Sequence, residues 1–246
     1  MLAERYLALH VRSKGSFVVH RFRSACTDRA QQRRLTAALE RMSHIRHPHL
    51  LSVENFSFAP GGRPLVVTPY TGNQDGLLTL ADLLDLKGGQ MGAFEAERAI
   101  LQLLDATSCT HAAGMPHGEL NLDEVMVDRR GSVFIELAGL RLAIGGRTGQ
   151  GSELLRDETR SIAEIGYRLI TGLPADEPFI PPTSVVRRLD RRWDEWFETA
   201  LEPSGGFETP SDAIDALPGN RREQAREAQP GPVRVVLQRL GIPGGA

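Results

Sequence analysis

Apolar and polar residues alternate along the first part of the chain in a pattern that predicts strands around a single helix. The helix is expected from Asp28 to about Ile45, where Leu35, Leu39 and Met42 form one apolar stripe opposite arginines. Two hairpins flank it, because short alternating segments stand on either side of turn-forming residues. The four strands are expected at residues 6–12, 17–23, 50–58 and 64–70.

The remainder of the chain has mostly helical periodicity, interrupted by two short apolar segments around Asp128–Gly131 that predict a small hairpin. Helices are expected at residues 78–86, 94–112, 157–171, 191–201 and 209–217. Strands with one helix, followed by a helical body, indicate an α+β fold with two lobes and not a βαβ alternation. The predicted parts are a small N-terminal lobe at 1–72, a helical C-terminal lobe at 73–217, and a linker with a short tail helix at 218–246.

Composition adds limits on partners. The formal net charge is −2, so the chain as a whole is not expected to bind nucleic acid. The first fifty residues nevertheless hold ten basic and three acidic residues, which predicts a basic N-terminal lobe. Only two of the 29 basic residues are lysines, Lys14 and Lys87, so any chemistry that requires a lysine must use one of them.

Cysteine usage and hydropathy indicate a cytoplasmic protein. Cys26 and Cys109 are too few for a disulfide framework and too far apart for a metal motif, which suits a reducing compartment and predicts no metal site. No apolar run has the length of a membrane span, and Glu4 and Arg5 stand where the apolar part of a signal peptide would begin.

Four segments, in their order and spacing, resemble motifs of the protein kinase superfamily, bacterial Ser/Thr type, over about residues 5–217. They are LERMSHIRHPHLLSV, PLVVTPYTG, HGEL and ETRSIAEIGYRLITGLP. The first is similar to the end of the regulatory helix and the segment after it, the second to the hinge strand with Thr68 as gatekeeper, and the third to the catalytic loop. The fourth resembles the long buried helix of the large lobe. The resemblance implies a two-lobed kinase-like fold with a reduced N-terminal β lobe.

The same resemblance places the catalytic positions on residues that differ from the family pattern. The phosphate-binding lysine corresponds to His20, its helix glutamate to Ala38, the catalytic aspartate to Glu119, the metal-binding asparagine to Glu124 and the D-F-G aspartate to Leu137. Two roles stay open at this point. Glu119 is either a surviving general base or a loop carboxylate, and His20 is either functional or packed on its strand.

Leu137 is the most damaging of these changes, because an apolar side chain cannot coordinate magnesium, which requires oxygen ligands. Strand alternation predicts that the neighbouring Glu136 points to the opposite face. Neither lysine is expected to replace the missing one, since Lys14 lies in the first turn and Lys87 in a loop. A glycine-rich loop is expected to be absent, and Ala138 replaces the D-F-G phenylalanine.

These changes predict a catalytically inactive pseudokinase that binds protein partners in signalling or scaffolding, needs no cofactor and is able to form a homo-oligomer. The alternative is a degenerate kinase that still binds nucleotide, with weak or atypical phosphotransfer. The Pro69 carbonyl and the Thr71 amide of the hinge support that alternative. H-G-[DE]-L also suits small-molecule phosphotransferases, which require the aspartate that Leu137 replaces.

The end of the chain predicts a short amphipathic helix. The polar, charged composition of the segment after Leu217 predicts a linker. An apolar stripe at i, i+3, i+4 and i+7 follows it, formed by Val233, Val236, Leu237 and Leu240. A helix this short is unstable alone in water. The stripe is therefore expected to dock on the chain's own domain or on a partner, or else to stay unfolded.

Overall fold

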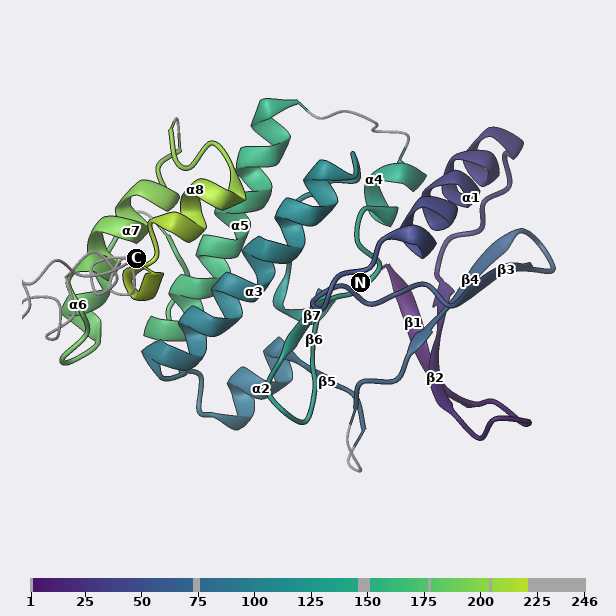
Figure 1. The fold of residues 1–246 in the computed structure, drawn as a ribbon, viewed down its shortest axis with the longest axis horizontal. Helices are drawn as coiled ribbons and strands as arrows, with labels where there is room; N and C mark the ends of the chain where they lie inside the picture. Colours follow the sequence, from purple (N-terminus) through teal and green to yellow (C-terminus); the bar gives the residue numbers. More distant parts are fainter. Residues whose placement is uncertain (1, 73–75, 146–150, 177, 204, 221–246) are drawn as a thin grey trace, which may run out of the picture.

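The computed structural model contains two lobes, one a four-stranded sheet with a helix beside it and the other a larger body of helices (Figure 1). The structure describes residues 2–72, 76–145, 151–176, 178–203 and 205–220. The predicted α+β arrangement of a small strand-rich lobe and a mainly helical lobe is confirmed. The predicted tail stripe of Val233, Val236, Leu237 and Leu240 lies outside the described residues.

The small lobe is built on an antiparallel sheet whose strands lie in the order β1-β2-β4-β3. Its elements are β1 (Ala3–Leu9), β2 (Ser16–Phe22), α1 (Arg29–His44), β3 (Asn55–Ala59) and β4 (Arg63–Pro69). Helix α1 begins where the sequence predicts, because the Asp28 side chain accepts a hydrogen bond from the Ala30 amide and so caps the first turn. The predicted stripe of Leu35, Leu39 and Met42 is buried in the hydrophobic core.

The second hairpin begins later than the sequence predicts. Residues 50–54 precede β3 and do not belong to it. Leu50 instead forms a parallel bridge with Ile135 of the large lobe, and the Leu51 amide donates to the Ile135 carbonyl at 3.1 Å. The apolar run that resembles a strand is therefore used to join the two lobes.

The large lobe contains a small three-stranded sheet, β5-β6-β7, and most of the helices. Its elements are β5 (Leu78–Thr79), α2 (Leu80–Leu86), α3 (Ala93–Ala112), the 3₁₀ turn η1 (Leu122–Glu124), β6 (Val125–Val127), β7 (Val133–Ile135), α4 (Leu140–Ile144), α5 (Ser152–Thr171), α6 (Pro182–Val185), α7 (Arg192–Ala200) and α8 (Pro210–Asp215).

Helices α3 and α5 run side by side through the centre of the large lobe and carry its core (Figure 1). Leu103 and Leu104 of α3 and Ile162 and Leu169 of α5 are fully buried, which explains their helical period. None of the described helices is long and apolar enough to cross a membrane.

Helix boundaries in the large lobe differ from the predictions at three places. Helix α5 starts at Ser152 rather than near residue 157, and the short helices α4 and α6 were not predicted. Leu78 and Thr79, predicted as helix, pair with β6 instead. The Thr79 hydroxyl then caps α2 by accepting from the Asp82 amide, so the strand passes directly into the helix.

Candidate site between the lobes

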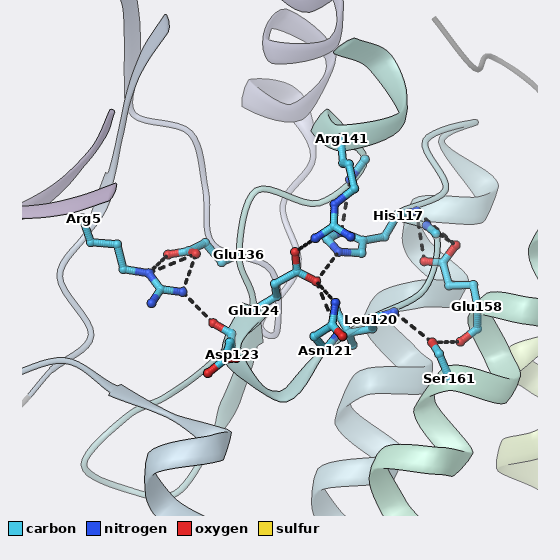
Figure 2. A network of polar contacts seen from close by, with 12 residues as sticks. Arg5, His117, Leu120, Asn121, Asp123, Glu124, Glu136, Arg141, Glu158 and Ser161 are labelled. Atoms are coloured by element: carbon cyan, nitrogen blue, oxygen red, sulfur yellow. Dashed lines mark hydrogen bonds and ion pairs between the residues drawn. The ribbon is translucent and has the colours of Figure 1, made fainter. Parts of the chain in front are cut away.

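The contact between the lobes centres on the carboxylate of Glu136, which follows β7. Arg5 of β1 binds it with two nitrogens: Nε lies 2.8 Å from Oε1, and Nη2 lies 2.7 Å from Oε2 (Figure 2). The same Nη2 also donates to the Asp123 carbonyl at 2.6 Å. The Arg5 and Glu136 side chains are 12% and 8% exposed, so this two-point ion pair is largely shielded from water.

His20 of β2 completes this cluster from the small lobe. Its Nδ1 lies 3.3 Å from Glu136 Oε1, and its Nε2 lies 2.8 Å from the Thr68 hydroxyl. The side chain is 1% exposed, and burial lowers its pKa below the ordinary value. Glu136 opposes that shift, whereas the positive charge of Arg5 adds to it. His20 is therefore neutral at pH 7.

Glu136 is the first residue after β7, and its side chain points to the small lobe. Leu137 has φ = 50°, a left-handed conformation that is uncommon for a residue other than glycine, and its side chain is buried. The expectation from strand alternation, that Glu136 faces away from the site, is wrong. The strand ends at Ile135, so alternation no longer determines where residues 136 and 137 point.

A second carboxylate, that of Glu124, is bound by groups of the large lobe. It forms an ion pair with Arg141 of α4 and accepts hydrogen bonds from the Asn121 side-chain amide at 3.0 Å and backbone amide at 3.3 Å (Figure 2). His117 Nε2 lies 3.6 Å from Oε2 of the same carboxylate. Asn121 and Glu124 together cap the η1 turn, which explains why this carboxylate points inward.

His117 is enclosed by charged groups from several elements. Its backbone amide donates to Glu158 of α5 at 3.0 Å, and its Nδ1 lies 3.4 Å from the Gly139 amide, as a neutral acceptor would. Burial lowers the pKa of His117 to about 4. Glu158 and Glu136 act against that shift, while Arg141 acts with it.

The Glu158 carboxylate binds backbone amides of the loop before η1. It accepts from the backbone amides of His117 and Gly118, and it contacts His111 Nε2 at 3.1 Å. One turn further along α5, the Ser161 hydroxyl accepts from the Leu120 amide at 3.0 Å (Figure 2). A single helix thus supplies the acceptors that shape this loop.

Comparison with known proteins identifies the fold. No protein-family model matches the chain. Two solved structures, of the Neurospora crassa PAN3 pseudokinase and of a mutant of it, superpose with TM-scores of 0.70 and 0.71 at 13% identity. They cover 92% and 91% of this chain, and 59% and 58% of those chains. At this identity the likeness establishes the fold.

Sequence relatives agree with that fold. Residues of this chain are 32% identical to Serine/threonine-protein kinase pkn1 of Chlamydia caviae over 125 residues, which is 50% of this chain and 19% of that protein. Pkn1 of Chlamydia trachomatis serovar L2 is 36% identical over 86 residues, which is 35% of this chain and 13% of that protein. CBL-interacting protein kinase 1 of Oryza sativa subsp. japonica is 29% identical over 96 residues, which is 39% of this chain and 20% of that protein. Over these segments the chain is similar in sequence to protein kinases, and its fold is kinase-like.

The matches to these kinases cover no more than about a fifth of their length. The predicted two-lobed kinase-like fold is confirmed.

Within this kinase fold, two of the five mapped catalytic positions lie in the polar clusters around Glu136 and Glu124. His20 contacts Glu136, and Glu124 contacts Arg141. Ala38 is fully buried in α1 and offers His20 no charge. Glu119 is exposed at the loop surface and belongs to neither cluster.

The hinge residues named from the sequence lie at the end of β4 and just after it. Pro69 is the last residue of β4 and pairs with Phe17 of β2, and Thr71 lies two residues further on. Use of the Pro69 carbonyl and the Thr71 amide by a nucleotide stays a prediction.

Magnesium and the triphosphate of ATP, which a kinase fold implies, do not fit the residues at these positions. Leu137 offers no oxygen ligand, and the carboxylates of Glu124 and Glu136 are each neutralised by an arginine. A buried neutral His20 cannot supply the positive charge that a phosphate requires. In the part of the chain that the structure describes, no three His, Cys, Asp or Glu side chains are grouped to hold a metal ion.

Sequence reasoning missed Arg5, Arg141 and Glu158 and placed Glu136 on the wrong face, and these four residues form most of the contacts in this site. One signal for Glu158 was available, because it begins the segment that resembles the long buried kinase helix. The others have no motif, and their roles follow from how the lobes pack.

Proposed function

We propose that this kinase-fold chain is a catalytically inactive pseudokinase that binds a protein partner in a bacterial signalling or scaffolding assembly. The observation that carries the proposal is the use of both cleft carboxylates as ion-pair partners. Glu124 is bound by Arg141 and Glu136 by Arg5, so a divalent cation would have to displace an arginine at either place. The Arg5–Glu136 pair is largely shielded from water, and breaking such a pair costs about 3–5 kcal/mol.

The other catalytic positions support the same proposal. A kinase stabilises its transferring phosphoryl group by positive charge and metal ions. His20 is neutral, Ala38 carries no carboxylate and Leu137 is apolar. We place the assembly in the cytoplasm, since Cys26 and Cys109 are both free thiols, as expected in a reducing compartment.

The second candidate is a degenerate kinase that binds nucleotide and transfers phosphate weakly or by an atypical route. Two features favour it. Its sequence relatives bear the names of protein kinases, and Glu119 is exposed where a substrate hydroxyl could approach it. Val18 counts against nucleotide binding. In the kinase resemblance it replaces a smaller alanine that lies over the adenine base, and its larger side chain is already buried.

Phosphate transfer separates the two candidates. The full chain would be incubated with labelled ATP and magnesium or manganese, alone and with a generic protein substrate. We expect no more transfer from the wild type than from the Glu119→Ala variant. Exposed Glu153 on α5 supplies the matched control, Glu153→Ala. Transfer that is lost in Glu119→Ala and kept in Glu153→Ala would overturn the proposal.

The partner requires a separate measurement. Affinity purification of the tagged chain from its native host should recover a protein in fixed ratio to it, and Glu119→Ala should recover that protein equally well. A partner that is released by ATP and magnesium, or lost with Glu119, would instead favour the second candidate.

A further inference from the structure

Strand β1 is a free edge of the four-stranded sheet and carries exposed apolar side chains. It pairs with β2 on one side, and no described strand pairs with its other side. Leu7 is 67% exposed and Leu9 is 61% exposed, and Tyr6 and Val11 are also exposed. A long apolar edge is a template for another strand, which proteins ordinarily cover or protect.

The hydrogen bonds at both ends of the β1–β2 ladder show which residues bond to β2. The His10 amide donates to the Gly15 carbonyl at 2.9 Å, and the Arg23 amide donates to the Leu2 carbonyl at 3.3 Å. Bonded and non-bonded pairs alternate along an antiparallel ladder. The even-numbered residues of β1 therefore direct their backbone groups toward β2.

The odd-numbered residues Arg5, Leu7 and Leu9 accordingly direct their N–H and C=O groups to the free edge. The Leu7 and Leu9 side chains lie on the sheet face shared by Arg5 and His20, because Arg5 pairs with His20 and Leu7 pairs with Val18. The edge thus combines unpaired backbone groups with an apolar stripe that extends the buried Val18.

The opposite edge of the sheet lacks these features. Strand β3 exposes Asn55 and Ser57, whereas Phe56 and Phe58 pack against the core. An added strand would find polar side chains there and no exposed apolar stripe. The apolar edge is particular to β1.

Positive charge is exposed at the turn end of β1. Arg12 and Lys14 are exposed, and neither forms an ion pair with a described residue. The acidic residue of this hairpin, Glu4, accepts a hydrogen bond from the Tyr6 hydroxyl. An incoming strand therefore meets net positive charge at the turn end of β1.

We propose that the β1 edge binds an acidic, extended peptide segment of a partner protein as an added fifth strand. Backbone groups of Arg5, Leu7 and Leu9 would pair with the segment, alternate apolar side chains would cover Leu7 and Leu9, and carboxylates would face Arg12 and Lys14. A second copy of the chain would bring the same positive charge. The tail segment at 233–242 is also basic, with two arginines and no acidic residue.

This inference rests on the proposed partner-binding role and names the surface and the chemistry of the partner. Its test uses two labelled peptides, acetyl-(Val-Glu)₄-amide and acetyl-(Val-Lys)₄-amide, titrated with the full chain while fluorescence polarisation is followed. We expect the acidic peptide to bind at least about tenfold more tightly than the basic one, with affinity that falls as salt rises.

Two sets of variants examine the backbone and the charge separately. Leu7→Pro removes an edge N–H without removing a β2 hydrogen bond, and it should weaken the acidic peptide at least about tenfold. Leu9→Pro repeats the test nearer the strand end, should Leu7→Pro fail to fold. Arg12→Glu with Lys14→Asn should weaken binding to a similar degree.

The matched control is Arg33→Glu with Arg34→Asn, which makes the same change of charge at exposed positions on α1. It should leave peptide affinity within about twofold of the wild type. Equal binding of both peptides, or no effect of the proline variants, would overturn the proposal.

Two further outcomes would assign the edge to another occupant and also overturn it. One is a dimer by sedimentation that Leu7→Pro converts to a monomer. The other is peptide binding that appears only when Val236→Asp and Leu237→Asp are introduced, since the tail would then be covering the edge. Phosphate transfer would refute the proposed function and would leave these peptide measurements unchanged, so the two failures are distinguishable.

Discussion

Arg5 and Glu136 lie 131 positions apart in the chain, and their side chains form a two-point ion pair that joins the small lobe to the large one. The carboxylate also lies 3.3 Å from His20 Nδ1, so one group of the large lobe contacts two side chains of the small lobe. These contacts link the two lobes of the kinase-like fold.

Removing Arg5 should destabilise the protein strongly. Arg5→Ala leaves the Glu136 carboxylate 8% exposed with only a neutral histidine beside it, and an unpaired buried charge costs about 3 kcal/mol or more. The free energy of unfolding, measured by urea denaturation, should fall by about that amount. The melting temperature should fall by roughly 6–12 °C, at about 2–4 °C for each kcal/mol.

A second substitution checks the cause. Glu136→Gln in the Arg5→Ala background removes the buried charge and should recover about half of the loss. If Arg5→Ala changes the unfolding free energy by less than about 1 kcal/mol, the pair behaves as a surface ion pair and does not hold the lobes together.

Glu158 should hold the loop that contains His117 and Gly118. Glu158→Ala leaves two buried backbone amides without their acceptor, at about 1–3 kcal/mol for each unsatisfied group. Amide hydrogen exchange of the loop should accelerate together with this loss of stability. Glu153→Ala, at an exposed site on the same helix, should change stability by less than about 0.5 kcal/mol. Unchanged exchange in Glu158→Ala would contradict the assigned role.

Stability should fall between pH 6.5 and pH 4 because of His117. Its pKa is about 4 in the folded protein and about 6.5 in the unfolded chain. Over this interval the unfolded chain binds a proton that the folded protein does not, so acid favours unfolding. The gap corresponds to roughly 3 kcal/mol at 1.36 kcal/mol per pKa unit. The loss is complete near pH 4, and His20 acts in the same direction.

Urea denaturation at several pH values measures this effect. The curve of His117→Asn should be flatter than that of the wild type across the interval, even where its stability at pH 7 is lower. His10→Asn, at an exposed position in the first turn, should run parallel to the wild type. Parallel curves for His117→Asn and the wild type would show that His117 is already protonated or is accessible to water.

ATP with magnesium should not stabilise the protein. A ligand that binds only the folded state at one hundred times its Kd adds about 2.7 kcal/mol. In a domain of this size that addition raises the melting temperature by several degrees. We expect a shift of no more than about a degree with millimolar ATP and magnesium. A larger shift would support the nucleotide-binding alternative, and an equal shift without magnesium would indicate binding through the hinge alone.

The tail prediction is tested with a chain that ends at Asn220. This end keeps the contacts of Gly219 with Glu97 and of Asn220 with the Ile214 carbonyl, which an end at Leu217 would remove. If the stripe of Val233, Val236, Leu237 and Leu240 docks on its own domain, the shortened chain should melt several degrees lower and bind an apolar dye. If the stripe binds a partner, stability should stay the same and the association should be lost. If neither the stability nor the association of the shortened chain changes, the prediction that this stripe docks is wrong.

The order of the long elements and the two-lobed arrangement follow from local sequence patterns. Local periodicity is a property of neighbouring residues, so the α1 stripe of Leu35, Leu39 and Met42 and the long α3 and α5 helices could be read directly. The sequence also showed the loss of oxygen ligand at Leu137, since that depends only on residue type and motif spacing. The short α4 and α6 helices were missed because a single turn has too little periodicity to be recognised.

The contacts of the remaining polar groups depend on tertiary packing. Arg5 with Glu136 and Arg141 with Glu124 are partners chosen by lobe packing, which no periodic pattern encodes. Leu50 joins Ile135 instead of β3 for the same reason. Glu136 follows the end of β7, where strand alternation ceases to apply. Contacts between distant residues depend on how the whole chain packs, and that packing converts the cleft of a kinase fold into a set of internal ion pairs.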